Sequence, residues 1–159
     1  MNIFVLDTDP RVSAAQHCDK HVVKMILETV QMLSTVRDRY GESAPYKPSH
    51  KKHPCTLWAG ASKENYVWLV QLGLALGKEF ESRYGKKHLS SIRLLEIVDP
   101  PESLPSLGLT PFAQAMPEAY KCADAVTAYR TYYINDKMRF ATWTRGASVP
   151  VWWPGLSAA

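Results

Sequence analysis

The residues of this chain that are best suited to chemistry lie close together near its start. When they are placed on a helix at about 100° per residue, four polar side chains fall within roughly 60° of one another: His17, His21, Lys24 and Glu28. A histidine titrates near neutral pH, and a carboxylate can transfer a proton or stabilise a developing positive charge. The spacing therefore predicts a polar stripe suited to acid–base chemistry, which Lys20, Gln31 and Thr35 extend.

Apolar residues flank this stripe and make it narrow. The opposite side of the same helix holds Ala15, Cys18, Val22, Met25, Ile26, Thr29, Leu33 and Val36. An ordinary surface helix has a broad polar face, so we expect this helix to be buried on most sides, with its stripe facing a cleft. The alternative interpretation is a solvated stripe in which Lys24 and Glu28 form a helical ion pair. Asp19 lies on the apolar side, where we expect it to pair with a basic residue of another helix.

A basic segment follows this helix. Five residues within a stretch of seven are basic or titratable, and no acid lies between Ser43 and Lys63: Lys47, His50, Lys51, Lys52 and His53. The net charge of +4 and the pI of about 9.0 allow a polyanionic partner. The segment is interpreted either as a solvated loop or as a loop that contacts phosphates.

The histidines also allow a metal site. His17 and His21 are four residues apart, a spacing that lets both imidazoles reach one ion, and His50 or His53 is a further ligand candidate. Lys20 and Lys24 lie on the same stripe and would repel a cation. We therefore expect neither a metal ion nor another cofactor.

The elements that must position these residues are mainly helical. Asp9 and Pro10 form a helix start. Apolar periodicity runs from Val12 to Val36, and Tyr40 and Gly41 form a stop. A helix of this length allows an interruption. We expect a single compact helical domain over residues 1–159, with a long N-terminal helix, little or no sheet, and a short extended segment at 2–7.

The rest of the chain gives further helix and loop signals. Three prolines and a glycine make 41–54 a loop, and Ser62 is an internal N-cap candidate in a second helical region from Thr56 to Tyr84, closed by Gly85. Leu57, Trp58, Tyr66, Leu69, Val70, Leu74 and Phe80 are its expected core residues. Later segments are expected as a helix at 90–98, an extended connection at 99–111, a helical turn at 111–120, a helix at 124–140 and an aromatic tail that folds back.

Composition indicates a cytoplasmic protein. No apolar run approaches the ~20 residues of a membrane helix, so no membrane partner is expected, and the first residues lack the pattern of a signal peptide. The three cysteines are odd in number and widely spaced, which favours free thiols in a reducing compartment. No feature indicates a particular oligomeric state.

The segment Asp19-Lys20-His21, followed after six residues by Glu28, resembles a known family. It is similar to the phage pyrimidine-dimer DNA glycosylases with AP-lyase activity, the endonuclease V type. The second helical region, from His53-Pro54 to Arg83-Tyr84-Gly85, and the aromatic segment from Tyr129 to Trp143 also resemble that family. Together these patches cover about two thirds of the chain.

The resemblance implies base excision from DNA, followed by strand cleavage at the abasic sugar. A free N-terminal amine would attack the sugar, Glu28 would stabilise the cationic sugar and transfer protons, and His21 would orient Glu28 or hold a phosphate. The basic residues would bind the DNA backbone: His17, Lys20, Lys24, Lys47, His50, Lys51, Lys52 and His53. An α-amine is partly neutral at pH 7, whereas an unperturbed lysine is not.

Position 2 departs from the family, in which Met1 is removed before a small residue. Asn2 would normally protect Met1 from removal. Either the Met1 amine is the nucleophile, or Lys24 serves after Lys20 lowers its pKa, or the chain is not a lyase. Two other functions stay open at this point: a non-catalytic nucleic-acid-binding domain, and a metal-dependent nuclease or nucleotide hydrolase that uses His17 and His21.

Overall fold

A computed structural model describes residues 1–154. These residues form six α-helices and two short 3-10 helices, without a strand: α1 Pro10–Gln16, α2 Asp19–Arg39, α3 Pro54–Ala59, α4 Lys63–Tyr84, α5 Leu89–Leu94, η1 Leu95–Ile97, η2 Glu118–Tyr120 and α6 Ala125–Asp136. The mainly α fold class is confirmed. The last five residues of the predicted domain, 155–159, lie outside the described part of the chain.

The predicted N-terminal helix is interrupted between α1 and α2. The Asp9 side chain accepts a hydrogen bond from the Arg11 N–H, and Pro10 occupies the first helical turn, as predicted. His17 has extended backbone angles, and the Asp19 N–H donates to Thr142 O at 2.8 Å instead of to a residue of α1. A contact with a distant segment thus decides where the second helix begins.

The second helical region is also in two pieces. His53 caps α3 by accepting from the Cys55 N–H, and Ser62 caps α4 by accepting from the Asn65 N–H. Gly85, at φ +69°, ends α4 in the left-handed conformation that glycine adopts at low cost. The predicted caps at Ser62 and Gly85 are confirmed, but Leu57 is 45% exposed and its assignment to the core was wrong.

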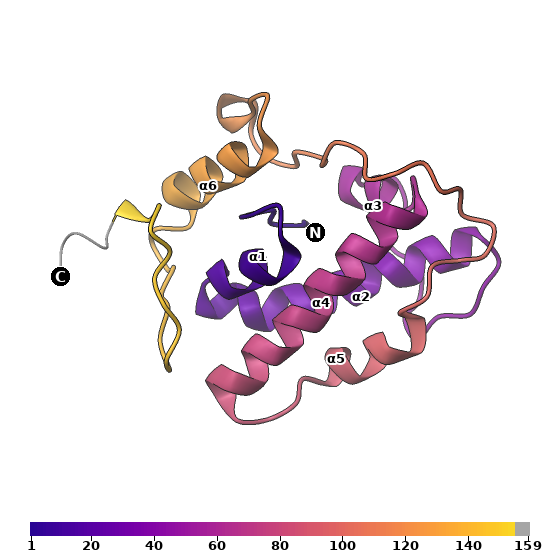
Figure 1. The fold of residues 1–159 in the computed structure, drawn as a ribbon, viewed down its shortest axis with the longest axis horizontal. Coiled ribbons are helices and arrows are strands. Elements are labelled where there is room, and N and C mark those ends of the chain that lie inside the picture. Colours follow the sequence, from indigo (N-terminus) through magenta and orange to yellow (C-terminus); the bar gives the residue numbers. More distant parts are fainter. Residues whose placement is uncertain (155–159) are drawn as a thin grey trace.

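Helices α2 and α4 cross at the centre of the fold, and α1, α3 and α5 pack around them (Figure 1). Gly73 allows the close approach of α4. A Cβ atom there would lie 2.9 Å from Cγ2 of Thr29 on α2 and 2.8 Å from Cδ2 of Leu94 on α5. A larger residue would therefore push these helices apart.

The N-terminal segment runs through the core without pairing into a sheet. Figure 1 shows it between the helical layer of α1 and α4 and the separate helix α6. The Ser13 hydroxyl on α1 accepts from the Leu6 N–H and donates to Phe4 O, and Arg130 on α6 donates to Leu6 O. Buried side chains from Ile3 to Leu6 hold it in place. This path carries the chain terminus towards the middle of α2.

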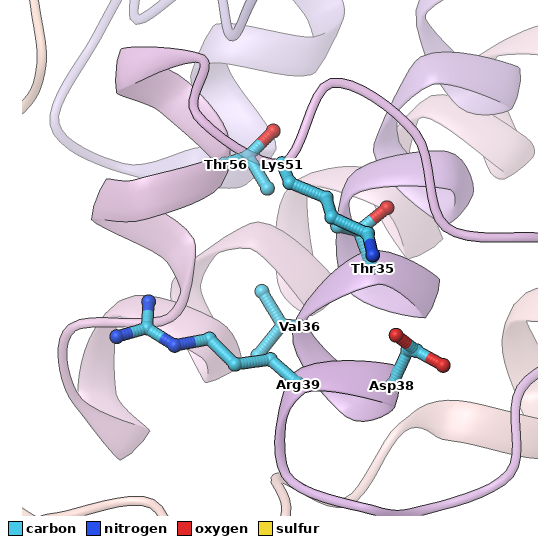
Figure 2. Close-up of a pocket in the computed structure, with 6 residues that line it drawn as sticks. All are labelled: Thr35, Val36, Asp38, Arg39, Lys51 and Thr56. Carbon is cyan, nitrogen blue, oxygen red and sulfur yellow. The ribbon is translucent and has the colours of Figure 1, made fainter.

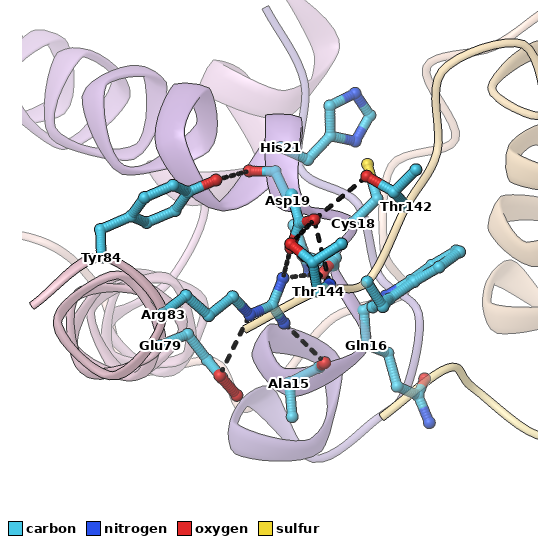
Figure 3. A network of polar contacts seen from close by, with 12 residues as sticks. Ala15, Gln16, Cys18, Asp19, His21, Glu79, Arg83, Tyr84, Thr142 and Thr144 are labelled. Carbon is cyan, nitrogen blue, oxygen red and sulfur yellow. Dashed lines mark hydrogen bonds and ion pairs between the residues drawn. The ribbon is translucent and has the colours of Figure 1, made fainter. Parts of the chain in front are cut away.

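The C-terminal part folds back onto the helices, as predicted for the aromatic tail. Trp143 and Trp153 are buried. Asp19 accepts hydrogen bonds from Thr142 and Thr144 of this segment and pairs with Arg83 of α4 at 3.1 Å (Figure 3). The expected basic partner of Asp19 is therefore Arg83. The later helices are shorter than predicted, since only Glu118–Tyr120 is helical within 111–120 and α6 ends at Asp136.

Candidate active site

The chain terminus and Glu28 meet in one pocket. The Met1 amine nitrogen lies 3.2 Å from Oε1 of Glu28, and the Asn2 N–H donates to the same oxygen at 3.0 Å. The Lys24 Nζ lies 3.6 Å from Oε2, one helical turn earlier on α2. Glu28 is 6% exposed. A small pocket of about 140 Å³ is lined by Met1, Asn2, Phe4, His21, Lys24, Met25, Glu28, Tyr132 and Lys137.

Asn2 anchors the terminus at this place. Its side-chain amide donates to Ala115 O at 2.8 Å, and its Oδ1 lies 3.1 Å from the Tyr129 hydroxyl on α6. The Cys55 thiol at the start of α3 donates weakly to the same Oδ1. Three segments that are distant in the sequence thus hold the second residue, and the terminal amine cannot move far from Glu28 without breaking these contacts.

Positive charge exceeds negative charge in the pocket. The Met1 amine, Lys24 and Lys137 surround the single carboxylate of Glu28. Lys137, just after α6, lies 4.6 Å above the Tyr132 ring and 5.8 Å from that of Phe4. Such a site favours an anionic ligand. Sequence reasoning missed Lys137, although its place in an aromatic and basic segment was a usable signal.

His21 is held rigidly in the wall of this pocket. Its Nδ1 lies 2.6 Å from the Tyr133 hydroxyl, and its ring stacks on Phe4 with the centroids 4.4 Å apart. Burial lowers the pKa of His21 to about 2, and nearby positive charges, among them Lys137 and Lys24, add to this effect. The imidazole is therefore neutral at physiological pH.

His17 does not join the site. It is fully buried at the end of α1, with Nδ1 2.6 Å from Ser13 O, and burial lowers its pKa to about 4. An enclosed side chain cannot contact a DNA backbone, so its assignment as a DNA-binding residue is corrected. Because His17 precedes α2, it also does not share a helical face with His21. No cluster that could hold a metal ion occurs among residues 1–154.

The basic loop is fastened to α2 beyond Glu28. The Ser49 N–H donates to the Thr35 hydroxyl at 3.0 Å, and that hydroxyl lies 2.9 Å from Gln31 O and 3.0 Å from Ser49 O. The side chains of Lys47, His50, Lys51 and Lys52 are exposed, as is that of Lys20 on α2. Burial, followed by the positive charge of the terminal amine, lowers the pKa of His53, and Glu28 opposes this shift. His53 thus lies in the electrostatic field of the site.

A second pocket lies between this loop and α2. Figure 2 shows its lining residues: Thr35, Val36, Asp38, Arg39, Lys51 and Thr56. Its volume is about 160 Å³, and its lining includes two cationic side chains, Lys51 and Arg39, and one carboxylate, Asp38. None of its lining residues belongs to the pocket of Glu28. An exposed cation of the loop, Lys51, therefore lies outside the pocket that contains the Met1 amine.

The comparisons with known proteins gave one match. A family model described as pyrimidine dimer DNA glycosylase matches residues 1–92, which include the chain terminus, Glu28 and the basic loop. No curated protein and no solved structure matches the chain. Within residues 1–154, no helix is both long and apolar enough to cross a membrane. The family model covers more than half of the 159 residues of this chain. The chain therefore belongs to the pyrimidine dimer DNA glycosylase family.

Proposed function

We propose that this protein excises damaged pyrimidines from DNA and then cleaves the strand at the abasic sugar, with its N-terminal amine as the nucleophile. The observation that carries the proposal is the 3.2 Å distance between the Met1 amine and Glu28 within a basic pocket. The family supports DNA as the substrate and glycosylase activity. The lyase step and the residue roles are our proposal.

In the first step, the lone pair of the neutral amine attacks C1′ of the sugar, and the bond from C1′ to the base breaks. The base leaves with the electron pair and takes up a proton. Glu28 accepts the proton that the amine must lose and stabilises the positive charge that develops on the sugar. The C1′–O4′ bond then breaks, O4′ takes up the proton that Glu28 holds, and a protonated imine remains between the amine nitrogen and C1′.

In the second step, a proton is removed from C2′ and the bond from C3′ to its oxygen breaks. The phosphate leaves with that electron pair, so the strand is cut. Water then hydrolyses the imine, which frees the amine of the protein from the sugar. In this proposal the same carboxylate accepts the C2′ proton. A covalent imine is therefore an obligatory intermediate, and this distinguishes the proposal from simple hydrolysis.

The Met1 amine is a better nucleophile candidate than Lys24. The Lys24 side chain is 64% exposed, so it lacks the burial that a lysine nucleophile needs. Met1 instead has an almost enclosed side chain and a fixed place at Oε1 of Glu28. We assign Lys24 to phosphate binding, with Lys20, Lys137 and the loop residues Lys47, His50, Lys51, Lys52 and His53.

The experiment that tests this function is reductive trapping with abasic-site DNA. Borohydride reduces the imine to a stable amine, so the wild-type protein should become covalently attached to the DNA. E28Q should trap at a rate lower by at least about 10²-fold. E96Q, which changes an exposed carboxylate on η1, is the matched control and should trap normally. DNA binding without any adduct would instead show a non-catalytic DNA-binding domain.

We further infer that the protein acts in the cytoplasm as a single folding unit. All three cysteines are free thiols, and two of them, Cys18 and Cys55, are buried. One continuous set of buried residues extends from Ile3 to Trp153, which supports a single domain. These inferences agree with an enzyme that meets DNA in a reducing compartment.

A further inference from the structure

A buried tyrosine contacts His21 without lining the pocket that contains Glu28. Tyr133 of α6 is fully buried, and its hydroxyl oxygen lies 2.6 Å from Nδ1 of His21. The Cys18 N–H donates to the same oxygen at 3.3 Å, and the Cys18 sulfur lies 3.6 Å away. These three groups are the polar partners of the phenol within the described chain.

The single proton of this phenol goes to His21. Tyr133 has one O–H, and two groups can accept it: the imidazole nitrogen at 2.6 Å and a thiol sulfur at 3.6 Å. Sulfur is a weak acceptor, whereas an imidazole nitrogen at this distance is a strong one. The Cys18 N–H already uses a lone pair of the oxygen. Tyr133 therefore donates to Nδ1, which must be unprotonated.

A neutral imidazole carries one proton, so it lies on Nε2 when Nδ1 is an acceptor. The ring has little freedom, because Phe4 stacks on one face and the rings of Phe140 and Tyr133 meet it at steep angles. His21 also lines the pocket with Met1 and Glu28. Nε2 is the ring nitrogen that remains for a ligand in that pocket.

We propose that Tyr133 is a positioning residue, which fixes His21 as a neutral Nε2–H donor to an oxygen of the nucleotide bound beside Glu28. The inference rests on the proposed function for the identity of that nucleotide. It goes further in giving His21 one role, that of a hydrogen-bond donor and not that of an acid or base. It also connects α6, outside the segment that the family model matches, to the chemistry.

The first test is the tautomer itself, measured by ¹⁵N NMR on the intact wild-type protein. The Nδ1 signal of His21 should be that of an unprotonated nitrogen and the Nε2 signal that of an N–H. In Y133F the loss of the phenol proton should shift the population towards Nδ1–H. A wild-type Nδ1–H tautomer, or an unchanged tautomer in Y133F, would overturn the inference and leave the lyase proposal untouched.

The second test separates positioning from structural support. Y133F should lower kcat on abasic-site DNA roughly five- to tenfold, as expected when one hydrogen bond in the transition state is lost, with KM unchanged. Y66F is the matched control, because Tyr66 is equally buried and donates to Ile97 O at 2.7 Å on another side of the fold. Equal losses in the two variants would contradict a positioning role. The absence of any trapped adduct in the wild type would instead overturn the proposed function.

Discussion

The backbone N–H of Asn2 donates to Oε1 of Glu28, the same oxygen that lies 3.2 Å from the Met1 amine. Removal of Met1 would turn the Asn2 nitrogen into the chain terminus without moving it away from the carboxylate. We therefore expect the site to accept a terminal amine at either position, so that the bulk of Asn2 would not decide whether the chain is a lyase.

The first prediction concerns the length of the chain ahead of this carboxylate. An extension of Gly-Ser before Met1 would move the free amine out of a pocket of about 140 Å³. We expect the extended protein to bind DNA normally but to lose borohydride trapping by at least about 10²-fold. The same two residues added at the C-terminus are the control. Normal trapping by the N-terminally extended protein would show that another amine reacts.

The second prediction concerns pH and the two buried histidines. Burial lowers the pKa of His17 to about 4 and of His21 to about 2, from the ordinary value of 6.5. The unfolded chain therefore binds more protons below pH 6.5, and stability must fall as the pH decreases below that value. The free energy of unfolding should fall by about 1.4 kcal/mol per pH unit for each histidine that stays neutral in the folded state.

Chemical denaturation between pH 7 and pH 5 measures this slope. H17Q should be less stable at pH 7 but should show a shallower pH dependence, because one of the two histidines is gone. Activity should show no inflection from His21 between pH 5 and 8, since burial lowers its pKa and the charged groups around it, Lys137, Lys24 and Lys20, also oppose its protonation. Stability that is constant over this range would contradict the burial argument.

The third prediction concerns the salt dependence of DNA binding. If Lys51 and Lys137 each contact a phosphate, K51A and K137A should each reduce the slope of log affinity against log salt by about one. K78A removes an exposed lysine on α4, away from the site, and should leave the slope unchanged. Binding isotherms at several salt concentrations give these slopes. A similar change in all three variants would indicate that net charge matters and position does not.

The fourth prediction concerns the buried pair of Arg83 and Asp19 (Figure 3). R83M leaves the carboxylate of Asp19 with its threonine donors but without its cation, and should cost about 3–5 kcal/mol of stability. R93M breaks an exposed pair with Glu96 and should cost less than about 1 kcal/mol. Both proteins should unfold in one transition, as expected of a single domain, and two separate transitions would contradict that proposal.

Much of the fold could be predicted from local signals in the sequence. Asp9, Ser62 and Gly85 act through their own side chain or backbone within one helical turn, so helix ends at these positions were predictable. The 3.6-residue period likewise placed Glu28, His21 and Lys24 at one site. The predicted contact of the N-terminal amine came from the family resemblance and agrees with the observed distance.

Contacts between distant segments were not predictable in this way. The break after His17 depends on a bond from Asp19 to Thr142 O. Lys137, which lines the pocket, and Tyr133, which contacts His21, lie more than a hundred residues after α2 begins. His17 was placed on the stripe because the period was continued through a break in the helix. Leu57 was assigned to the core although α3 is too short for a periodic pattern to fix its face.

The position of the covalent link shows directly whether the N-terminal amine is the nucleophile. Wild-type protein would be trapped on abasic-site DNA with borohydride, digested with a protease and analysed by mass spectrometry. We expect the sugar remnant on the α-nitrogen of the N-terminal peptide, at Met1 or at Asn2 after processing. A remnant on the Nζ of Lys24 or on any other lysine would contradict the proposal.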